Sequence, residues 1–435
     1  MCGMQSGESQ PVMTFGPVWA SGANQAPPTI ALPESRRVDV AVIGVGYMGV
    51  TAALALATGG ARVAVVEKGA LAAGASGLNG GQVIPGLKSG PSELIARLGR
   101  ERGEAVIRYV MRSAELVFEL VREHGMDCEF VRSGWIQAAA SRAALPEIKV
   151  RVAECNQWGG DARVLEAHEV QSLLGSRTGA YRGGWLDRNA GTLHPLNYLY
   201  GLVRAAHGAG ADIYTESSAA AISRHGELWQ LRLAHGPTLS ADAILVCTNA
   251  YTDDLWPGLR QSVLPASSLQ LATAPLSASL LAQILPQRQA VSESRRVMNY
   301  FRIGPQGRLV FGGRGPFRTA QPRDYQELIR GMVRLYPQLQ GVPVEYCWAG
   351  KVALTRDFLP HVHQPRPGLW LALGCNGRGI GLMSALGTSL GQQLLGRPAT
   401  HPFGVTPLRP LPLHRLHKLY AGALIHYFRL LDRLS

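Results

Sequence analysis

The sequence has few cysteines and no pattern that would join them. Its six cysteines form neither a CxxC pair nor any paired spacing, which in a long chain predicts free thiols in a reducing compartment and no zinc site. No run of about 18 apolar residues is present, so we expect no membrane-spanning helix. The first 35 residues lack a basic segment followed by an apolar one, so we expect a cytoplasmic protein without a signal peptide. The cysteines are Cys2, Cys128, Cys155, Cys247, Cys347 and Cys375.

Lysine is scarce as well, because only five of the 43 basic residues are lysines. The formal net charge of +13 would suit nucleic acid, a membrane surface or an anionic ligand. The basic residues are nevertheless scattered along the chain, without a stripe of interleaved aromatics. We therefore expect a small-molecule partner and no nucleic acid. The lysines are Lys68, Lys88, Lys149, Lys351 and Lys418.

Apolar patterns at both ends of the chain predict parallel β-strands. Residues 38–44 and 62–67 are dense apolar strands on either side of a helical segment at 48–58, which makes a βαβ unit with a right-handed crossover. Residues 369–374 form another buried strand that precedes a glycine-rich turn, and residues 264–344 alternate as strands of an antiparallel sheet do. The sequence therefore predicts an α/β nucleotide-binding domain built from separate segments, with an inserted domain. Helices are expected at 92–125, 142–158, 195–210, 324–335 and 382–395.

The first strand ends in a Gly44-x-Gly46-x-x-Gly49 turn that opens a helix. The first glycine permits the tight turn, the second lets a pyrophosphate approach the backbone, and the third lets helix and strand pack closely. The pyrophosphate would face the helix N-terminus, whose free N–H groups and positive dipole end favour anions. Glu67 follows Gly46 by 21 residues, which suits the ribose hydroxyls of an adenosine half. The pattern predicts a dinucleotide site, the alternative being a plain crossover that binds nothing.

The segment after Glu67 bears on which dinucleotide binds. It is a polar loop where an NAD enzyme would usually continue with another βα unit, and its backbone could line the ribityl and isoalloxazine parts of FAD. Taken alone, this leaves both cofactors open. The residues concerned are Ser76, Asn79, Gly80, Gly81 and Gln82.

Several motifs in the same order resemble one family of flavoproteins. They are residues 75–82, 193–197, 249–251, 350–355 with Pro360-His361, and 376–379. Together they look like the D-amino acid oxidase/glycine oxidase/sarcosine oxidase family, and within it they most resemble the gamma-glutamylputrescine oxidase-like branch. The resemblance covers residues 38–396.

This resemblance implies a Rossmann-like FAD-binding domain with an inserted substrate domain that contains an antiparallel sheet, an α/β fold with an α+β cap. We expect the FAD-binding domain at 37–90, 160–258 and 348–400, and the substrate or cap domain at 91–159 and 259–347. Residues 1–36 are expected to be a flexible arm. Residues 401–435 are expected to be a basic tail helix, docked on the protein or, as the alternative, in contact with a membrane surface.

The resemblance also implies a reaction, the oxidation of the C–N bond of an amine or amino acid. A hydride passes from the α-carbon to flavin N5, the imine hydrolyses, and O2 reoxidises the flavin to give hydrogen peroxide. Val352 stands where some relatives carry a flavin-linked cysteine, which implies non-covalent FAD. Strand residues 308–313 lack the lysine that those relatives use with oxygen, so a dehydrogenase that passes electrons to a quinone or carrier protein is the alternative.

The cofactor contacts are expected at the two glycine-rich turns and the loop after the first βαβ unit. The second turn would place helix N–H groups where they stabilise negative charge on the reduced flavin. Cys375 departs from the aromatic residue that relatives often carry there. The expected cofactor-binding residues are Gly44, Gly46, Gly49, Glu67, Lys68, Ser76, Asn79, Gly80, Gly81, Gln82, Asn376, Gly377, Arg378, Gly379 and Ile380.

No acid–base residue stands out, so the substrate-binding residues are the candidates to name. Arg302 and Lys351 are those we expect to bind a substrate carboxylate. Tyr251 and Tyr300 would close an aromatic lid, although each is equally typical of a packed core. Three residues in the motifs are expected to be structural: His194, His361 and Asp357.

The alternatives from other functional classes are a flavin-binding module without catalysis and a basic nucleic-acid binder. The absence of a second GxGxxG disfavours a monooxygenase.

Overall fold

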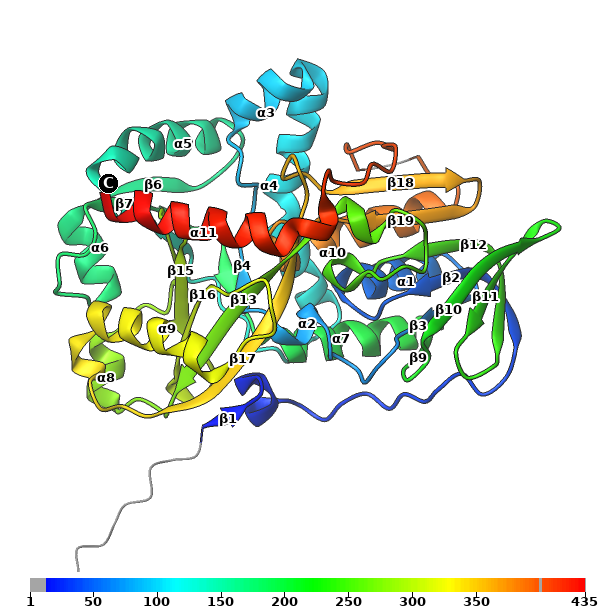
Figure 1. Ribbon diagram of the computed structural model, residues 1–435, viewed down its shortest axis with the longest axis horizontal. Coiled ribbons are helices and arrows are strands. Elements are labelled where there is room, and N and C mark those ends of the chain that lie inside the picture. Colours follow the sequence, from blue (N-terminus) through cyan, green and yellow to red (C-terminus); the bar gives the residue numbers. More distant parts are fainter. Residues whose placement is uncertain (1–12, 399–400, 435) are drawn as a thin grey trace, which may run out of the picture.

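Two large sheets lie side by side in the computed structural model, which describes residues 13–398 and 401–434 (Figure 1). The first contains the strand that precedes the glycine turn and is mostly parallel. The second is mostly antiparallel and forms the cap. The five cysteines within the described residues are free and buried, whereas Cys2 lies outside them. Within the same residues, no helix is both long and apolar enough to cross a membrane.

The mostly parallel sheet orders its strands β10-β11-β12-β2-β3-β9; in addition, β19 pairs with β12, and β18 pairs with β19. The apolar runs expected at 38–44, 62–67 and 369–374 are its strands β2, β3 and β19, and α1 packs closely against α10 and α7. The bounds are β2 (Arg36–Ile43), β3 (Val63–Val66), β9 (Asp212–Tyr214), β10 (Ala219–His225), β11 (Leu228–Leu233), β12 (Thr238–Val246), β18 (His361–Arg366), β19 (Leu369–Leu373), α1 (Tyr47–Thr58), α7 (Pro195–Gly208) and α10 (Gly379–Leu394).

The nine-stranded cap sheet orders its strands β1-β17-β13-β16-β15-β14-β5-β7-β6. A small third sheet pairs β4 (Gln82–Val83) with β8 (Gly191–Thr192). The cap strands are β1 (Thr14–Phe15), β5 (Trp135–Ala138), β6 (Ala162–Glu166), β7 (Gly183–Asp187), β13 (Leu264–Thr273), β14 (Ala290–Glu293), β15 (Asn299–Ile303), β16 (Leu309–Arg314) and β17 (Val344–Leu354). The remaining helices are α2 (Ala75–Leu78), α3 (Pro91–Leu98), α4 (Arg100–Glu123), α5 (Leu145–Gln157), α6 (Ala167–Leu174), α8 (Ala278–Gln283), α9 (Pro322–Leu335) and α11 (His417–Leu434).

The sheets divide the chain differently from the expected domain boundaries in two places. Strands β6 and β7 pair with each other and with β5 in the cap sheet, although residues 160–258 were assigned to the nucleotide domain. The helix expected at 92–125 is two helices that break at Gly99, whose φ is +79°. The second of them, α4, packs against α10 and so belongs with the nucleotide-binding core. Both differences arise because strand pairing and helix packing are long-range, and local patterns do not encode them.

The described part of the N-terminal segment is built into the protein, so the expectation of a flexible arm is wrong for residues 13–36. Strand β1 pairs in parallel with β17, and a short 3-10 helix at Val18–Gly22 follows it. In that helix the side chain of Trp19 is fully buried. Its ring contacts His194 and Trp348 edge-on, and its Nε1 donates to the Asn79 carbonyl over 2.9 Å. This segment therefore supports the loop that carries Asn79.

We expect Trp19→Ala to lower the free energy of unfolding by about 3–5 kcal/mol, since truncating a buried tryptophan removes its burial and leaves a cavity. The measurement is urea unfolding followed by circular dichroism. Phe15→Ala is the matched control, because Phe15 lies four residues earlier and is 60% exposed. If both variants lost the same small amount of unfolding free energy, Trp19 would not anchor the segment.

Candidate functional site

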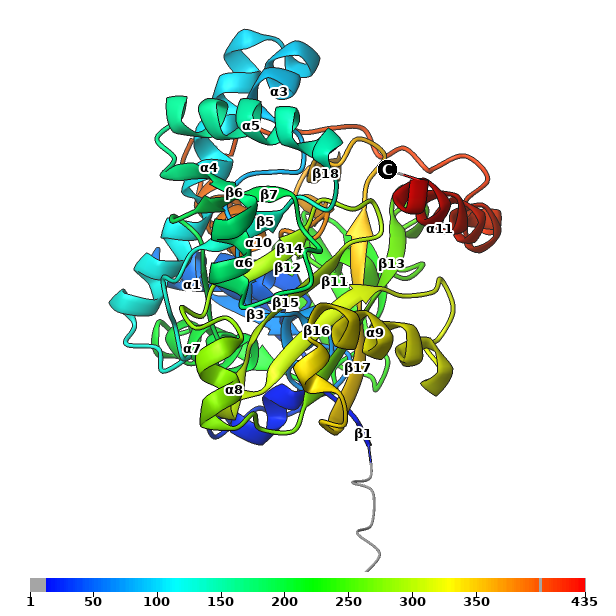
Figure 2. The same cartoon turned by 90° about the vertical axis from the view of Figure 1, so that its left-hand side faces the viewer.

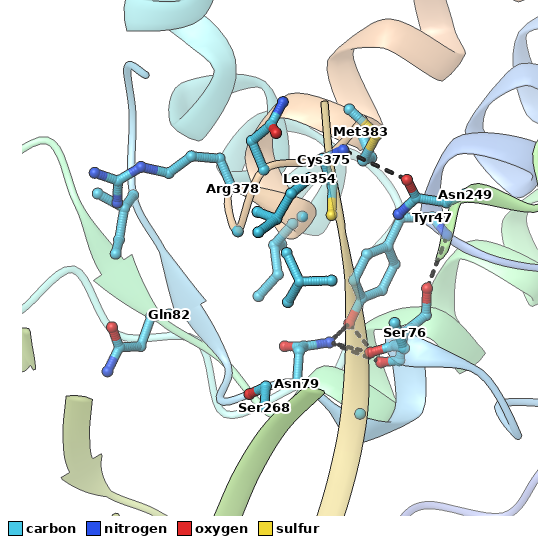
Figure 3. A pocket seen from close by; sticks show the side chains of 18 of the residues that line it. Tyr47, Ser76, Asn79, Gln82, Asn249, Ser268, Leu354, Cys375, Arg378 and Met383 are labelled. Carbon is cyan, nitrogen blue, oxygen red and sulfur yellow. Dashed lines mark hydrogen bonds between the residues drawn. The ribbon is translucent and has the colours of Figure 1, made fainter. Parts of the chain in front are cut away.

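A cavity of about 820 Å³ lies between the two sheets and takes lining residues from both. The ends of β2 and β3 and the turn before α10 contribute from the nucleotide domain, and β5, β7, β15 and β17 contribute from the cap. Figure 3 shows part of this lining. A cavity enclosed by two domains is a common place for a small-molecule site.

The first glycine turn has the geometry that the motif requires. Gly44 has a φ of +108°, which favours glycine, and a Cβ at Gly49 would lie 2.0 Å from the Gly44 carbonyl oxygen. Gly49 therefore serves helix–strand packing and does not line the cavity. Tyr47 N donates to Ser76 Oγ over 3.2 Å, and Val45 N donates to Glu67 Oε2 over 3.0 Å. These bonds place Ser76 and Glu67 beside the N-terminus of α1.

Asn79 fixes the loop that follows. Its Nδ2 donates to the Tyr47 hydroxyl over 2.9 Å (Figure 3). Its Oδ1 accepts from Gly81 N over 2.9 Å. Gly81 has a φ of +67°, and a Cβ there would lie 2.3 Å from the Leu193 carbonyl oxygen. Gly81 thus shapes the turn outside the cavity lining, whereas Gln82 lines the cavity.

The second glycine turn, before α10, is held by two asparagines. Buried Asn376 accepts from Thr355 N at its Oδ1 over 3.0 Å and donates from Nδ2 to the Gly374 carbonyl over 2.9 Å. Asn249 Oδ1 accepts from Gly374 N over 3.0 Å. A Cβ at Gly377 or Gly379 would meet no atom within 4 Å, although both line the cavity. Their backbone therefore faces open space at the N-terminus of a 16-residue helix.

The described residues thus fit a dinucleotide. Two helix N-termini face one cavity, where free N–H groups and the positive dipole ends favour anionic groups, and glycine at both turns leaves room for a ligand. Thirteen of the expected cofactor residues line the cavity, and Gly49 and Gly81 stand behind it. The thirteen are Gly44, Gly46, Glu67, Lys68, Ser76, Asn79, Gly80, Gln82, Asn376, Gly377, Arg378, Gly379 and Ile380.

Arg302 does not lie in the cavity, so the structure does not support it as a substrate ligand. It is 3% exposed, and its Nη1 donates to the carbonyl oxygens of Gly81 and Leu193 over 2.8 and 2.7 Å. Its guanidinium also lies 5.6 Å from the centre of the Trp19 ring. Arg302 therefore holds the turn at Gly81 from behind.

The other three substrate candidates do line the cavity. Lys351 is exposed, and its Nζ lies 5.3 Å from the centre of the Tyr251 ring. The Tyr300 hydroxyl bonds to Ser268 Oγ and to the Leu269 carbonyl, and burial raises its pKa to about 12. Tyr300 therefore keeps its proton at neutral pH and can donate a hydrogen bond.

The motif histidines and Asp357 have the structural roles that we expected. His194 Nδ1 accepts from Asn197 N over 3.2 Å and so caps α7. His361 bonds to Asp357 and Thr406, and Asp357 Oδ1 also accepts from Leu359 N over 3.1 Å. Among the described residues, no histidine lines the cavity.

Several charged residues that were not expected at the site line the cavity, and Arg378, which was expected at the cofactor, also presents its side chain to it. The Arg378 side chain points away from Tyr47 and Asn79 (Figure 3), and its guanidinium lies 5.0 Å from the centre of the Trp135 ring. No carboxylate of the described residues forms a salt bridge with it, although Asp187 lies close enough for its charge to act on the Arg378 guanidinium. Arg314, Lys88 and Asp187 also line the cavity. No local signal marks Arg314, which is one of 38 arginines, or Asp187, which lies in an unexpected strand.

Burial changes how these groups titrate. It raises the pKa of Asp187, which is 2% exposed, to about 6. It lowers the pKa of Arg378 to about 10, which still leaves a cation at neutral pH. Desolvation and the neighbouring Arg314 and Arg378 lower the pKa of Lys88 to about 8. Below that pH Lys88 is a cation like Arg314 and Arg378, and none of the three forms a salt bridge with a carboxylate of the described residues.

Comparison with known proteins gives consistent matches over most of the chain. A model of the FAD dependent oxidoreductase family matches residues 39–393. Gamma-glutamylputrescine oxidoreductase of Escherichia coli (strain K12) is 27% identical over 422 residues, which are 96% of this chain and 98% of the relative. The probable oxidoreductase OrdL of Rhizobium meliloti (strain 1021) is 32% identical over 369 residues, which are 84% and 85% of the two chains. The crystal structure of glycine oxidase from Geobacillus kaustophilus has a TM-score of 0.71 at 23% identity and covers 86% of this chain and 99% of that chain. The similarity to this glycine oxidase structure confirms the expected α/β fold.

Proposed function

This chain belongs to the family of FAD dependent oxidoreductases that its motifs predicted, and we propose that it oxidises the C–N bond of an amine or amino acid that carries a carboxylate. FAD, when bound, supplies a two-electron acceptor that takes a hydride from the carbon next to the nitrogen. The cofactor is held without a covalent bond, consistent with Val352 at the position of the flavin-linked cysteine of some relatives. The observation that carries the substrate class is the Arg378 guanidinium in the cavity, which forms no salt bridge with any carboxylate of the described residues.

The residues that would hold FAD are those of the two turns. The backbone of Gly44 and Gly46 and the N-terminus of α1 would bind the pyrophosphate, and Glu67 would bind the ribose hydroxyls. The backbone at Gly377 and Gly379 would support the flavin end with N–H groups at the N-terminus of α10, where the positive dipole end favours negative charge. Each of these residues lines the cavity.

Arg378 is the residue that we assign to the substrate carboxylate. A guanidinium binds a carboxylate through two parallel hydrogen bonds, and a guanidinium over the Trp135 ring keeps its N–H edge free for them. Arg314 and Lys88 add positive charge to the same cavity. Arg378 was expected at the cofactor, and we propose that its backbone faces the cofactor while its side chain faces the substrate.

The amine end of the substrate would lie on the side of the cavity where Tyr251 and Tyr300 stand. Their rings can exclude water from the reacting carbon, and the Tyr300 hydroxyl, whose proton is donated to the Leu269 carbonyl, can accept a hydrogen bond from the substrate amine and so orient it. Because no histidine of the described residues lines the cavity, the amine would have to lose its proton before hydride transfer without a histidine base.

The Asp187 carboxyl should make the affinity of the cavity for carboxylates depend on pH. Its carboxyl is neutral below about pH 6, which removes its repulsion of a bound carboxylate. We therefore expect propionate to bind more tightly as the pH falls from about 7.5 to about 5, by about threefold to tenfold. The flavin difference spectrum gives the dissociation constant. Asp187→Asn should bind propionate tightly at both pH values, whereas Asp242→Asn, a change outside the cavity lining, should behave as the parent. A pH dependence that survives in Asp187→Asn would contradict this assignment.

For the acceptor we propose O2, with release of hydrogen peroxide after the imine hydrolyses. A dehydrogenase that uses a quinone or carrier protein is the second candidate, favoured by the lack of lysine on β16. Peroxide formed per substrate consumed in air separates the two. A ratio near one supports the oxidase, and turnover that needs an artificial acceptor supports the dehydrogenase.

The decisive experiment for the proposed function is an anaerobic screen of the purified flavoprotein. The flavin absorbance should bleach with one member of a panel of D- and L-amino acids, N-methyl amino acids and gamma-glutamyl polyamines. The matched amine without a carboxylate should bleach it far more slowly. The proposal fails if the protein neither contains nor takes up FAD, or if amines without a carboxylate are oxidised equally well.

A further inference from the structure

The exposed large hydrophobic side chains of the protein are concentrated in its C-terminal segment. Seven of the 13 such residues among those described lie between positions 413 and 430, and the other six are scattered over positions 15–405. Scattered exposed apolar residues are normal on a protein surface, whereas a contiguous group marks an interaction site. The seven are Leu413, Leu416, Leu419, Tyr420, Leu424, Tyr427 and Leu430.

Helix α11 is docked on the cap through its opposite face. Ala421 is 5% exposed there, and the Asp432 carboxylate accepts from Arg296 N over 3.2 Å and from Val297 N over 2.9 Å. Arg429 pairs with Glu327 of α9 over 3.5 Å. Both ribbon views place α11 on the outside of the molecule (Figures 1 and 2). The exposed apolar side chains are therefore not needed for docking.

The spacing of these side chains puts them on one outward face. Leu416, Tyr420, Leu424 and Tyr427 follow one another at steps of three or four residues, as neighbours on one side of a helix do. Leu419 and Leu430 widen this stripe. Arg415 and Lys418 are also exposed, and they precede Leu416 and Leu419 directly at the N-terminal end of this segment. We call the stripe together with these two basic residues the outer face of α11.

We propose that the outer face of α11 binds the surface of an anionic lipid bilayer. A helix with an apolar face and basic residues beside it lies in the interface plane, with the apolar side chains among the acyl chains and the cations at the headgroups. The positive charge of the protein favours a lipid surface over a second copy of this chain as the partner, because two chains of formal net charge +13 repel each other. This inference does not depend on the proposed substrate.

The experiment is flotation of the purified FAD-containing protein with lipid vesicles. We expect it to float with vesicles of phosphatidylglycerol and phosphatidylcholine, and to bind pure phosphatidylcholine at least about tenfold more weakly. About 1 M salt should weaken the binding to the anionic vesicles, since the Debye length falls to about 3 Å. Binding that is equal on both vesicle types would overturn the anionic preference.

Variants test the assignment to α11. Leu419→Glu with Leu424→Glu should lower vesicle binding at least about tenfold, and Arg415→Gln with Lys418→Gln should remove the preference for phosphatidylglycerol. Val150→Glu is the matched control, because Val150 lies on α5 and is 58% exposed. The FAD content should be unchanged in all three. Unaltered flotation of the double glutamate variant would refute the proposal, as would a dimer that forms without vesicles and is lost in that variant.

Discussion

Arg378→Met is expected to lower kcat/KM for the carboxylate substrate by about 100-fold or more. The change removes the two hydrogen bonds of the guanidinium and leaves the substrate carboxylate desolvated without a partner, a loss of about 2–5 kcal/mol in comparable sites. Arg378→Lys keeps the charge but not the planar fork, so we expect an intermediate loss. Most of the effect should appear in KM, because the carboxylate is bound in the ground state as well as in the transition state.

Two controls separate substrate binding from damage to the fold. Arg224 also stacks on a tryptophan, 5.6 Å from the centre of the Trp229 ring, but lies outside the cavity lining, so Arg224→Met should leave kcat/KM unchanged. The activity of Arg378→Met toward the amine without a carboxylate should also equal that of the parent. If both substrates lost activity equally, Arg378 would serve the cofactor or the fold instead.

Gly379→Leu is expected to abolish retention of FAD while the protein stays folded. A side chain at this position enters the open space of the cavity, since its Cβ would meet no atom within 4 Å. Leucine is also compatible with the first turn of α10, so the helix should form. The measurements are the ratio of flavin to protein after purification and the melting curve with FAD absent.

Gly208→Leu is the matched control, because Gly208 ends α7, is exposed, and would also place its Cβ in open space. Its flavin content should equal that of the parent. A Gly379→Leu protein that keeps a full complement of FAD would show that the cofactor does not use the turn before α10. Loss of the folding transition would instead point to a packing role for Gly379.

The nucleotide-binding turns could be predicted because their chemistry is local. A tight turn, a close helix–strand contact and an open helix N-terminus each require glycine at a fixed offset, and Gly44 and Gly49 meet these requirements in the structure. The apolar strands beside them are buried on both faces of the sheet, so their sequence is continuously apolar. Asn376, another expected cofactor residue, also lines the cavity, where its side chain fixes the loop.

The substrate end of the cavity could not be predicted in the same way. Arg302 satisfies three backbone carbonyls in the core, and nothing in the strand around it distinguishes such an arginine from a ligand. Asp187 lies on β7, and it is the pairing of β7 with β5 that brings this strand to the cavity. Trp19 lies in a segment rich in Gly, Ser and Pro, and its burial depends on contacts with residues 60 or more positions away. These positions depend on tertiary contacts, which no local spacing records.

The anchorage of α11 has a practical consequence for handling the enzyme. Asp432 lies three residues from the end of the chain and holds Arg296, which also lines the cavity. The last turn of α11 is therefore a support for the cavity wall. Any change that pulls this turn of α11 away from Arg296 would disturb the substrate side of the site.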